Sequence, residues 1–232
     1  MAGSAIIIGA SSGIGLALAK ELSARSYRIA LAARRVELLT AHASEDPCVQ
    51  LVRRMDLTEP AAPGILEEMA AALGGVDLII ISSGTGHLNP DLTWEPEAET
   101  IETNVTGFTR LAIAAMHIFG KQGRGHLVGI SSVAALRGAA EAPAYGASKA
   151  FMSRYLQALH LRARRSGLPI RVTDVRPGFV DTPMMKADKP FWVSSPGKAA
   201  QQIMDGVERG WRILYVSRRW WIIGWLLRHL PE

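Results

Sequence analysis

The chain is short of several features that would decide its class at once. Among its 232 residues there is one cysteine, Cys48, which rules out an internal disulfide and suits a reducing compartment. The N-terminus lacks a basic segment followed by a long apolar run, so no signal peptide is expected. These shortages together predict a cytoplasmic protein.

The charge balance excludes a second class. The net charge is only +5, and the basic residues are scattered except near Arg162–Arg165 and Arg218–Arg219. A nucleic-acid-binding domain would concentrate such residues on one face or in one stretch, so no nucleic-acid partner is expected. The 48% hydrophobic and 20% charged content describes an ordinary globular chain, long enough for one sizeable domain.

Patterns for metal or serine-nucleophile chemistry are missing too. The sequence has no Gly-x-Ser-x-Gly turn, and no histidine is placed to activate Ser12 or Ser148, so neither serine is expected to be a nucleophile. No metal site is expected, because the following histidines lack metal-ligand spacing with a cysteine or carboxylate: His87, His117, His126, His160 and His229.

What the chain does have is a regular alternation of strand and helix. Short apolar runs predict seven strands, at residues 5–8, 28–33, 49–52, 76–81, 126–130, 170–175 and 212–216. Helical patterns lie between them at 16–24, 58–73, 98–119 and 144–166. This alternation predicts a Rossmann-type α/β domain, a doubly wound parallel sheet with helices on both faces. Glycine-rich or polar segments follow five of the strands, and ligands bind at that edge of such sheets.

A glycine-rich turn joins the first predicted strand to the first helix. Gly9, Gly13 and Gly15 would let the backbone turn sharply and approach a pyrophosphate at the positive end of the helix. The alternative is a plain glycine turn, because the spacing differs from the common Gly-x-Gly-x-x-Gly. The other residues expected to contact the phosphates here are Ser11, Ser12 and Ile14.

The end of the second strand indicates which nucleotide is bound. An enzyme that uses NAD usually has an acidic residue there, which accepts hydrogen bonds from the ribose hydroxyls. This chain has Ala33 followed by Arg34 and Arg35. Guanidinium groups bind phosphate through forked, charge-assisted hydrogen bonds, so the 2′-phosphate of NADP is the predicted ligand. Arg34 is favoured because it is nearer the strand end; alternatively, both arginines only begin an exposed helix.

Three residues suggest proton transfer. Tyr145 and Lys149 are four residues apart in a helical pattern, so their side chains share one face. A neighbouring ammonium favours tyrosinate and is expected to lower the pKa of Tyr145, which makes it a usable acid and base. Ser132, upstream, offers a hydroxyl that can hold a substrate oxygen beside the phenol.

Taken together, these motifs resemble the short-chain dehydrogenase/reductase family, in its compact one-domain form, over about residues 4–216. The family's glycine motif matches Gly9, Gly13 and Gly15, although Ile8 replaces its usual leading threonine. The segment after the fourth strand departs from the family's Asn-Asn-Ala-Gly, since it reads Ser82-Ser83-Gly84. The family's catalytic tetrad matches Asn104, Ser132, Tyr145 and Lys149. Its other cofactor contacts match Asp56, Leu57, Ser83, Gly84, Pro177, Gly178, Val180 and Thr182.

The resemblance implies a role for each member of the tetrad. Tyr145 would be the acid in carbonyl reduction and the base in alcohol oxidation, and Ser132 would orient the substrate oxygen. Lys149 would also bind the nicotinamide ribose, and Asn104 would hold a water that passes protons to Lys149. The resemblance implies an NADP-dependent oxidoreductase that forms a homodimer or homotetramer. The alternatives are an NADP-binding regulator without turnover and a membrane-surface protein.

Two segments bear on the substrate and on partners. Residues 179–195 follow the last shared motif and are expected to form an apolar lid, which contains Met184, Met185, Phe191, Trp192 and Val193. Residues 218–232 form a tail beyond the domain at 1–217. Its apolar run, 220–227, is too short to span a bilayer, which takes ~20 residues. The tail is expected to cover the body or a second subunit; lying in a membrane interface is the alternative.

Overall fold

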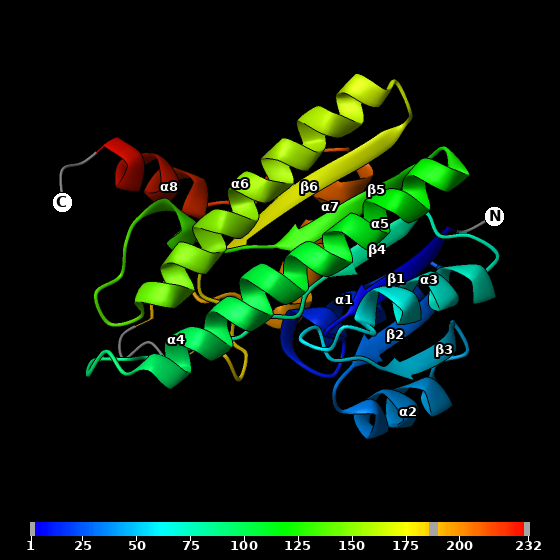
Figure 1. Cartoon of the computed structure of the whole chain (residues 1–232), viewed down its shortest axis with the longest axis horizontal. Coiled ribbons are helices and arrows are strands. Elements are labelled where there is room, and N and C mark those ends of the chain that lie inside the picture. The colour runs from blue at the N-terminus through cyan, green and yellow to red at the C-terminus, as the bar shows by residue number, and fades with distance from the viewer. Residues whose placement is uncertain (1–2, 186–189, 230–232) are drawn as a thin grey trace.

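The computed structural model describes residues 3–185 and 190–229 and has a single seven-stranded parallel sheet at its centre (Figure 1). The strand order is β3-β2-β1-β4-β5-β6-β7, which confirms the predicted doubly wound fold. All seven predicted strands are present, with ends moved by one or two residues. Their bounds are β1 Ser4–Ile8, β2 Arg28–Ala33, β3 Val49–Arg54, β4 Leu78–Ile81, β5 Gly125–Ile130, β6 Ile170–Pro177 and β7 Ile213–Val216.

Helices cover both faces of the sheet, because alternate strand residues point to opposite sides. Ile6 and Ile8 of β1 pack in one core with α3 (Ala62–Ala72), α5 (Phe108–Gln122) and α6 (Pro143–Ser166). Ala5 and Ile7 pack in the other core with α1 (Gly13–Ala24), α2 (Val36–Glu45) and α7 (Pro196–Glu208). Continuous apolar strands are therefore buried on both sides, as the parallel sheet requires.

Helix α1 lies against a helix from the far end of the chain. Its Leu18 and Leu22 share a core with Ile203 and Met204 of α7. Just beyond α1, Arg25 donates to Asp205 at 2.8 Å and pairs with Glu208 at 2.7 Å. The first and last thirds of the chain are thus packed together on one face of the sheet.

Three helical regions differ from the prediction. The pattern at 98–119 is α4 (Trp94–Ile101), a π-helical turn (Glu102–Gly107) and α5, because Asn104 and Gly107 must fit closely against other loops. Helix α2 was predicted only within the alternative that Arg34 and Arg35 begin an exposed helix. Helix α7 was not predicted. The buried face of α7 combines small and large apolar residues, and Ser195 caps its first turn by accepting from Lys198 N–H at 3.3 Å.

The tail forms α8 (Trp220–His229), which lies at one end of the molecule (Figure 1). Gly224 lets it approach Tyr215 of β7 and Leu136, since an added Cβ would lie 2.8 and 3.0 Å from them. Trp220 is buried, whereas Trp221 and Ile222 are exposed. Over the part of the chain that the structure describes, no helix combines the length and apolarity needed to cross a bilayer.

Candidate active site

The glycine-rich turn needs its glycines for two different reasons. Gly9 has a φ of +89°, and a Cβ there would come within 2.5 Å of the Ser83 nitrogen in the loop after β4. A Cβ on Gly15 would lie 2.1 Å from the Gly9 oxygen. Gly13, with a φ of +58°, begins α1 and lies close to Thr182 at the start of the lid. The turn, the loop after β4 and the lid thus meet at one point, where the N-terminus of α1 is available to a phosphate.

Arg35 reaches this turn from the end of β2. Its guanidinium Nη2 lies 3.1 Å from Ser11 Oγ and 3.1 Å from Ser12 Oγ. Arg34, the residue favoured from the sequence, is exposed, as is Arg35. The contact therefore places Arg35 beside the glycine-rich turn. Arg34 and Arg35 also directly precede α2, as expected from the alternative prediction that they begin an exposed helix.

Asp56 and Leu57 follow β3 at the same edge of the sheet. The Asp56 carboxylate accepts from the Thr58 backbone N–H at 3.0 Å and from the Thr58 hydroxyl at 2.9 Å. Leu57 is buried, and it leaves no room for a side chain on Gly107, whose added Cβ would lie 2.7 Å away. Asp56 and Leu57, both predicted cofactor contacts, are therefore held in place by local contacts.

The loop after β4, whose sequence departs from the family pattern, is held in place by Asn104. The Asn104 amide donates to Thr85 O at 2.7 Å and accepts from Thr85 N–H at 2.9 Å. It also donates to Ser148 Oγ of α6 at 3.0 Å, and the residue is fully buried. Gly84 is enclosed by Lys149 and Asn104. The side chain thus fastens the loop to α6, and its water-holding role stays a prediction.

Ser132, Tyr145 and Lys149 meet at the carboxyl end of β5. Ser132 caps the short 3-10 helix Val133–Leu136 by accepting from Ala134 N–H at 3.1 Å, and its hydroxyl is close enough to the Tyr145 phenol to act on the pKa of that group. Lys149 is buried, donates to Ile130 O at 3.0 Å and lies 5.8 Å from the centre of the Tyr145 ring. A serine, a phenol and an ammonium so arranged can hold a carbonyl oxygen and exchange a proton with it.

The prediction that Lys149 lowers the pKa of Tyr145 is wrong in its net direction. Burial raises the pKa of the Tyr145 phenol above its usual value, and the hydrogen bond with Ser132 opposes the rise. Burial also lowers the pKa of Lys149 to about 8, with the Asp174 carboxylate acting in the other direction. Tyr145 therefore holds its proton at neutral pH, which was not predicted because burial cannot be judged from residue spacing.

Helix α6 is fixed at the end that carries Tyr145. Glu97 of α4 accepts from the Ala144 N–H at 2.8 Å, where a carboxylate is favoured by the helix dipole. The same carboxylate accepts from the Asn89 amide at 2.8 Å. On the other side, Gly86 lies against the Tyr145 ring, since an added Cβ would approach a ring carbon to 2.4 Å. The end of α6 that carries the phenol is thus held by α4 and by the loop after β4.

The segment after β6 brings the tail to the site. Ser132 Oγ lies 3.5 Å from Pro177 O, and Gly178 is covered by the Trp220 indole, which a Cβ on Gly178 would approach to 2.0 Å. Val180 is buried and pairs with Ser194, which draws the two ends of the lid together. Trp220 was not predicted as a site residue, because nothing in the sequence links position 220 to position 178.

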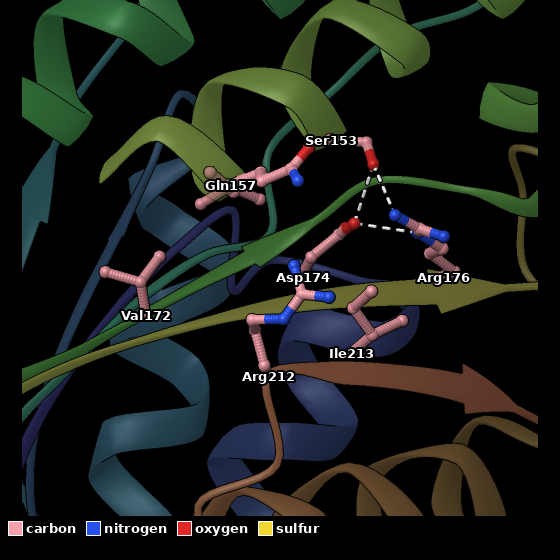
Figure 2. A pocket seen from close by; sticks show the side chains of 8 residues that line it. Ser153, Gln157, Val172, Asp174, Arg176, Arg212 and Ile213 are labelled. Carbon is pink, nitrogen blue, oxygen red and sulfur yellow. Dashed lines mark hydrogen bonds and ion pairs between the residues drawn. The ribbon is translucent and has the colours of Figure 1, made fainter. Parts of the chain in front are cut away.

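Ser131 and Ser132 contact different groups, although they are adjacent in the chain. Ser131 Oγ donates to the buried Asp174 carboxylate of β6, and Arg176 of the same strand donates to Asp174 at 2.7 Å (Figure 2). This buried charged group beside the candidate catalytic residues was not predicted. Among the described residues, no three His, Cys, Asp or Glu side chains gather as a metal site.

Comparison with known proteins gives consistent matches. The family model for short chain dehydrogenase matches residues 4–191. An uncharacterized oxidoreductase of Myxococcus xanthus is 35% identical, over 89% of this chain and 84% of its own. A short-chain dehydrogenase from Sphingobium yanoikuyae in complex with NADPH superposes with a TM-score of 0.83 at 26% identity, covering 99% of this chain and 97% of its own. A short-chain dehydrogenase/reductase from Burkholderia phymatum in complex with NAD has a TM-score of 0.85 at 19% identity, over 97% and 92%.

Proposed function

The chain belongs to the short-chain dehydrogenase/reductase family of NAD(P)-dependent oxidoreductases, and from that premise we propose that it transfers hydride between NADP(H) and a carbonyl or alcohol substrate. The observation that carries the proposal is that Ser132, Tyr145 and Lys149 come together at the carboxyl end of β5, where Lys149 donates to Ile130 O and lies 5.8 Å from the Tyr145 ring centre. These residues lie at the sheet edge that also holds the glycine-rich turn.

The residues at that edge fit a dinucleotide. Gly9 and Gly15 keep side chains out of the turn, and Gly13 leaves the N-terminus of α1 open beside Thr182, so a pyrophosphate can approach backbone N–H groups. Arg35 adds a positive charge at the turn. When bound, the nicotinamide supplies or accepts the hydride.

The protein's part in carbonyl reduction is proton delivery and orientation. Tyr145 donates its phenol proton to the carbonyl oxygen as hydride reaches the carbon, which gives an alcohol and leaves tyrosinate. Burial keeps the phenol protonated at neutral pH, the form that reduction needs. Ser132 hydrogen-bonds the same oxygen, and the ammonium of Lys149 stabilises the tyrosinate that forms.

Arg35 supports NADP over NAD. It lies between the end of β2 and the glycine-rich turn, where a forked guanidinium would bind the 2′-phosphate, and Ala33 offers no carboxylate to the ribose. We expect Arg35→Asp to lower the ratio of kcat/KM with NADPH to kcat/KM with NADH by about tenfold or more. A tenfold change corresponds to a loss of ~1.4 kcal/mol in the preference for NADPH. Arg34→Asp is the matched control at the neighbouring exposed position. A larger shift in Arg34→Asp would return the role to Arg34, and a parent enzyme that prefers NADH would refute NADP.

The substrate side supports an apolar substrate. Phe179, Phe191, Trp192 and Trp220 form one aromatic cluster, with ring centres 5.0–6.1 Å apart, next to Gly178. Rings of this kind favour bulky or aromatic ketones over small or charged carbonyls.

The test is a screen of ketones and aldehydes with NADPH, followed by loss of absorbance. Aryl ketones should give higher kcat/KM than short aliphatic aldehydes and than keto acids of similar size. Turnover of none of them, with NADPH still bound, would favour a cofactor-binding protein without carbonyl reductase activity.

A further inference from the structure

A buried charged group joins the two elements that carry the catalytic residues. Asp174 and Arg176 lie two residues apart on β6, so they face the same side of the sheet, toward α6. Both side chains are almost fully buried, at 4% and 6% exposure. Figure 2 shows the Asp174 carboxylate between Arg176 and Ser153.

The carboxylate accepts from both neighbouring elements. Ser131, at the end of β5, donates to Oδ1, and Ser153 of α6 donates to Oδ2 at 2.7 Å. Arg176 donates from Nε to the same Oδ2 at 2.7 Å and from Nη2 to Ser153 Oγ at 2.7 Å. Its remaining contact is with the Tyr215 hydroxyl of β7, at 3.0 Å. Every polar group in this cluster is therefore satisfied.

The two serines are placed directly beside the catalytic residues. Ser131 lies between Ile130, whose oxygen accepts from Lys149, and Ser132. Ser153 follows Lys149 by one helical turn, as Lys149 follows Tyr145, so all three lie on one face of α6. The Asp174 carboxylate contacts both serines and thus lies where β5, which leads to Ser132, meets α6, which carries Tyr145.

Stability alone does not explain the charges. Burying an ion pair costs several kcal/mol per ion in desolvation, and apolar residues of similar volume are often as good or better. The neighbours on the same two elements, Met152, Leu156 and Val172, are apolar core residues, so an apolar contact here was available. A polar group that is expensive to bury and touches two catalytic elements calls for another role.

We propose that Asp174 is a positioning residue for the catalytic centre, holding the end of β5 that carries Ser132 against the face of α6 that carries Tyr145 and Lys149. The proposal rests on the proposed oxidoreductase function and adds to it a residue that touches none of the reacting atoms.

The charge of Asp174 also acts on Lys149. Among the described residues, Lys149 lies near the Tyr145 ring on its own helix, the neutral Asn104 and the Ile130 carbonyl; the charge that acts on it from β6 is Asp174, which is itself paired with Arg176. Asp174 favours the ammonium and so keeps the pKa of Lys149 from falling further below about 8. Removing this carboxylate should therefore move the Lys149 titration to lower pH.

Two variants separate positioning from folding. Asp174→Asn keeps the shape and an acceptor for Ser131 but removes the charge. Ser153→Ala keeps the ion pair and removes the direct bond to α6. The control is Asp205→Asn, which takes a carboxylate from Arg25 on the far face of the sheet. The readouts are the melting temperature, NADPH binding by fluorescence, kcat and the pH profile of kcat/KM with the best ketone substrate.

We expect Asp174→Asn to lower kcat about tenfold or more, because small displacements of catalytic groups can cost ~10²-fold. The midpoint of its pH profile should move to lower pH. Ser153→Ala should lower kcat about threefold or more, a drop of ~0.6 kcal/mol in transition-state stabilisation, without moving that midpoint. Asp205→Asn should change neither.

Parental kcat and an unmoved midpoint in Asp174→Asn would overturn the proposal, and if that variant does not fold, parental kcat in Ser153→Ala would do so. A parent enzyme that binds NADPH but turns over no carbonyl would instead overturn the proposed function, and the positioning role with it.

Discussion

Trp220 offers a measurable test of how the tail is attached. Its indole is 3% exposed, lies on Gly178 and contacts the rings of Phe179, Phe191 and Trp192. We predict that Trp220→Ala lowers the free energy of unfolding by about 3 kcal/mol, because α8 loses its anchor on the body.

The magnitude follows from two opposing contributions. A buried aromatic side chain removes ~150–250 Å² from water, which at ~25 cal/mol per Å² stabilises the fold by about 4–6 kcal/mol. Trp220 Nε1 is buried and has no hydrogen-bond partner among the described residues, which costs about 1–3 kcal/mol. The difference is about 3 kcal/mol, or a fall in melting temperature of roughly 6–12 °C for a domain of this size.

The measurement is urea unfolding followed by circular dichroism, which does not depend on tryptophan emission. Trp220→Phe is the first control: it keeps a ring and removes the unpaired N–H, so it should stay within ~1 kcal/mol of the parent. Trp221→Ala is the second: this neighbour is 61% exposed, so its loss should cost less than ~0.5 kcal/mol.

Equal unfolding midpoints for Trp220→Ala and Trp221→Ala would refute the docked tail. Deleting residues 218–232 should destabilise the chain at least as much as Trp220→Ala. If the truncated protein keeps its melting temperature and mass but loses binding to liposomes, the result would favour the alternative that the tail lies in a membrane interface.

Three further predictions can be tested with single substitutions. Tyr145→Phe keeps the ring and removes the proton donor, so turnover should fall by at least ~10² while NADPH binding survives; turnover within a few-fold of the parent would exclude Tyr145 as the acid. Gly178→Ala should cost about 1–3 kcal/mol in the parent but far less in Trp220→Ala, because the added methyl meets the indole; equal costs in both backgrounds would contradict this contact. Burial, with Arg171 nearby, lowers the pKa of His126 to about 4 in the folded protein. Near pH 5 the imidazole is therefore protonated in the unfolded chain but largely neutral in the folded protein. Stability should therefore fall by about 2 kcal/mol from pH 7 to pH 5 through this residue, and His126→Gln should remove that part of the urea-measured loss.

The sheet and the glycine-rich turn could be predicted because their signals are local. An apolar run bounded by glycine, as in residues 5–8 before Gly9, specifies a buried strand and the turn after it. Tyr145 and Lys149 could be paired because a helix fixes their spacing. Each of these predictions needed only neighbouring residues and a known repeat.

The parts that could not be predicted depend on partners distant in sequence. The burial of Asp174 and Arg176 was not predicted, because the groups that satisfy them, Ser131, Ser153 and Tyr215, come from three other elements. Arg35 could not be separated from Arg34 without the position of Ser11 and Ser12. The direction of the pKa shift of Tyr145 likewise depends on burial, which comes from the packing of several segments.

The packing of α1 against α7 has a consequence for how the chain folds during synthesis. The sheet order lets β1, β2, β3 and β4 assemble from the first 81 residues, but one face of α1 is then still uncovered. Leu18 and Leu22 are covered only when α7 has been synthesised. The partner of Arg25, Asp205, likewise follows it by 180 residues in the chain. At ~5–20 residues per second, this apolar surface stays exposed for roughly 10 seconds or more on the ribosome. A truncated product that ends before α7 leaves this apolar surface permanently exposed and should aggregate or be degraded. The first third of the chain therefore depends on the last third for its solubility.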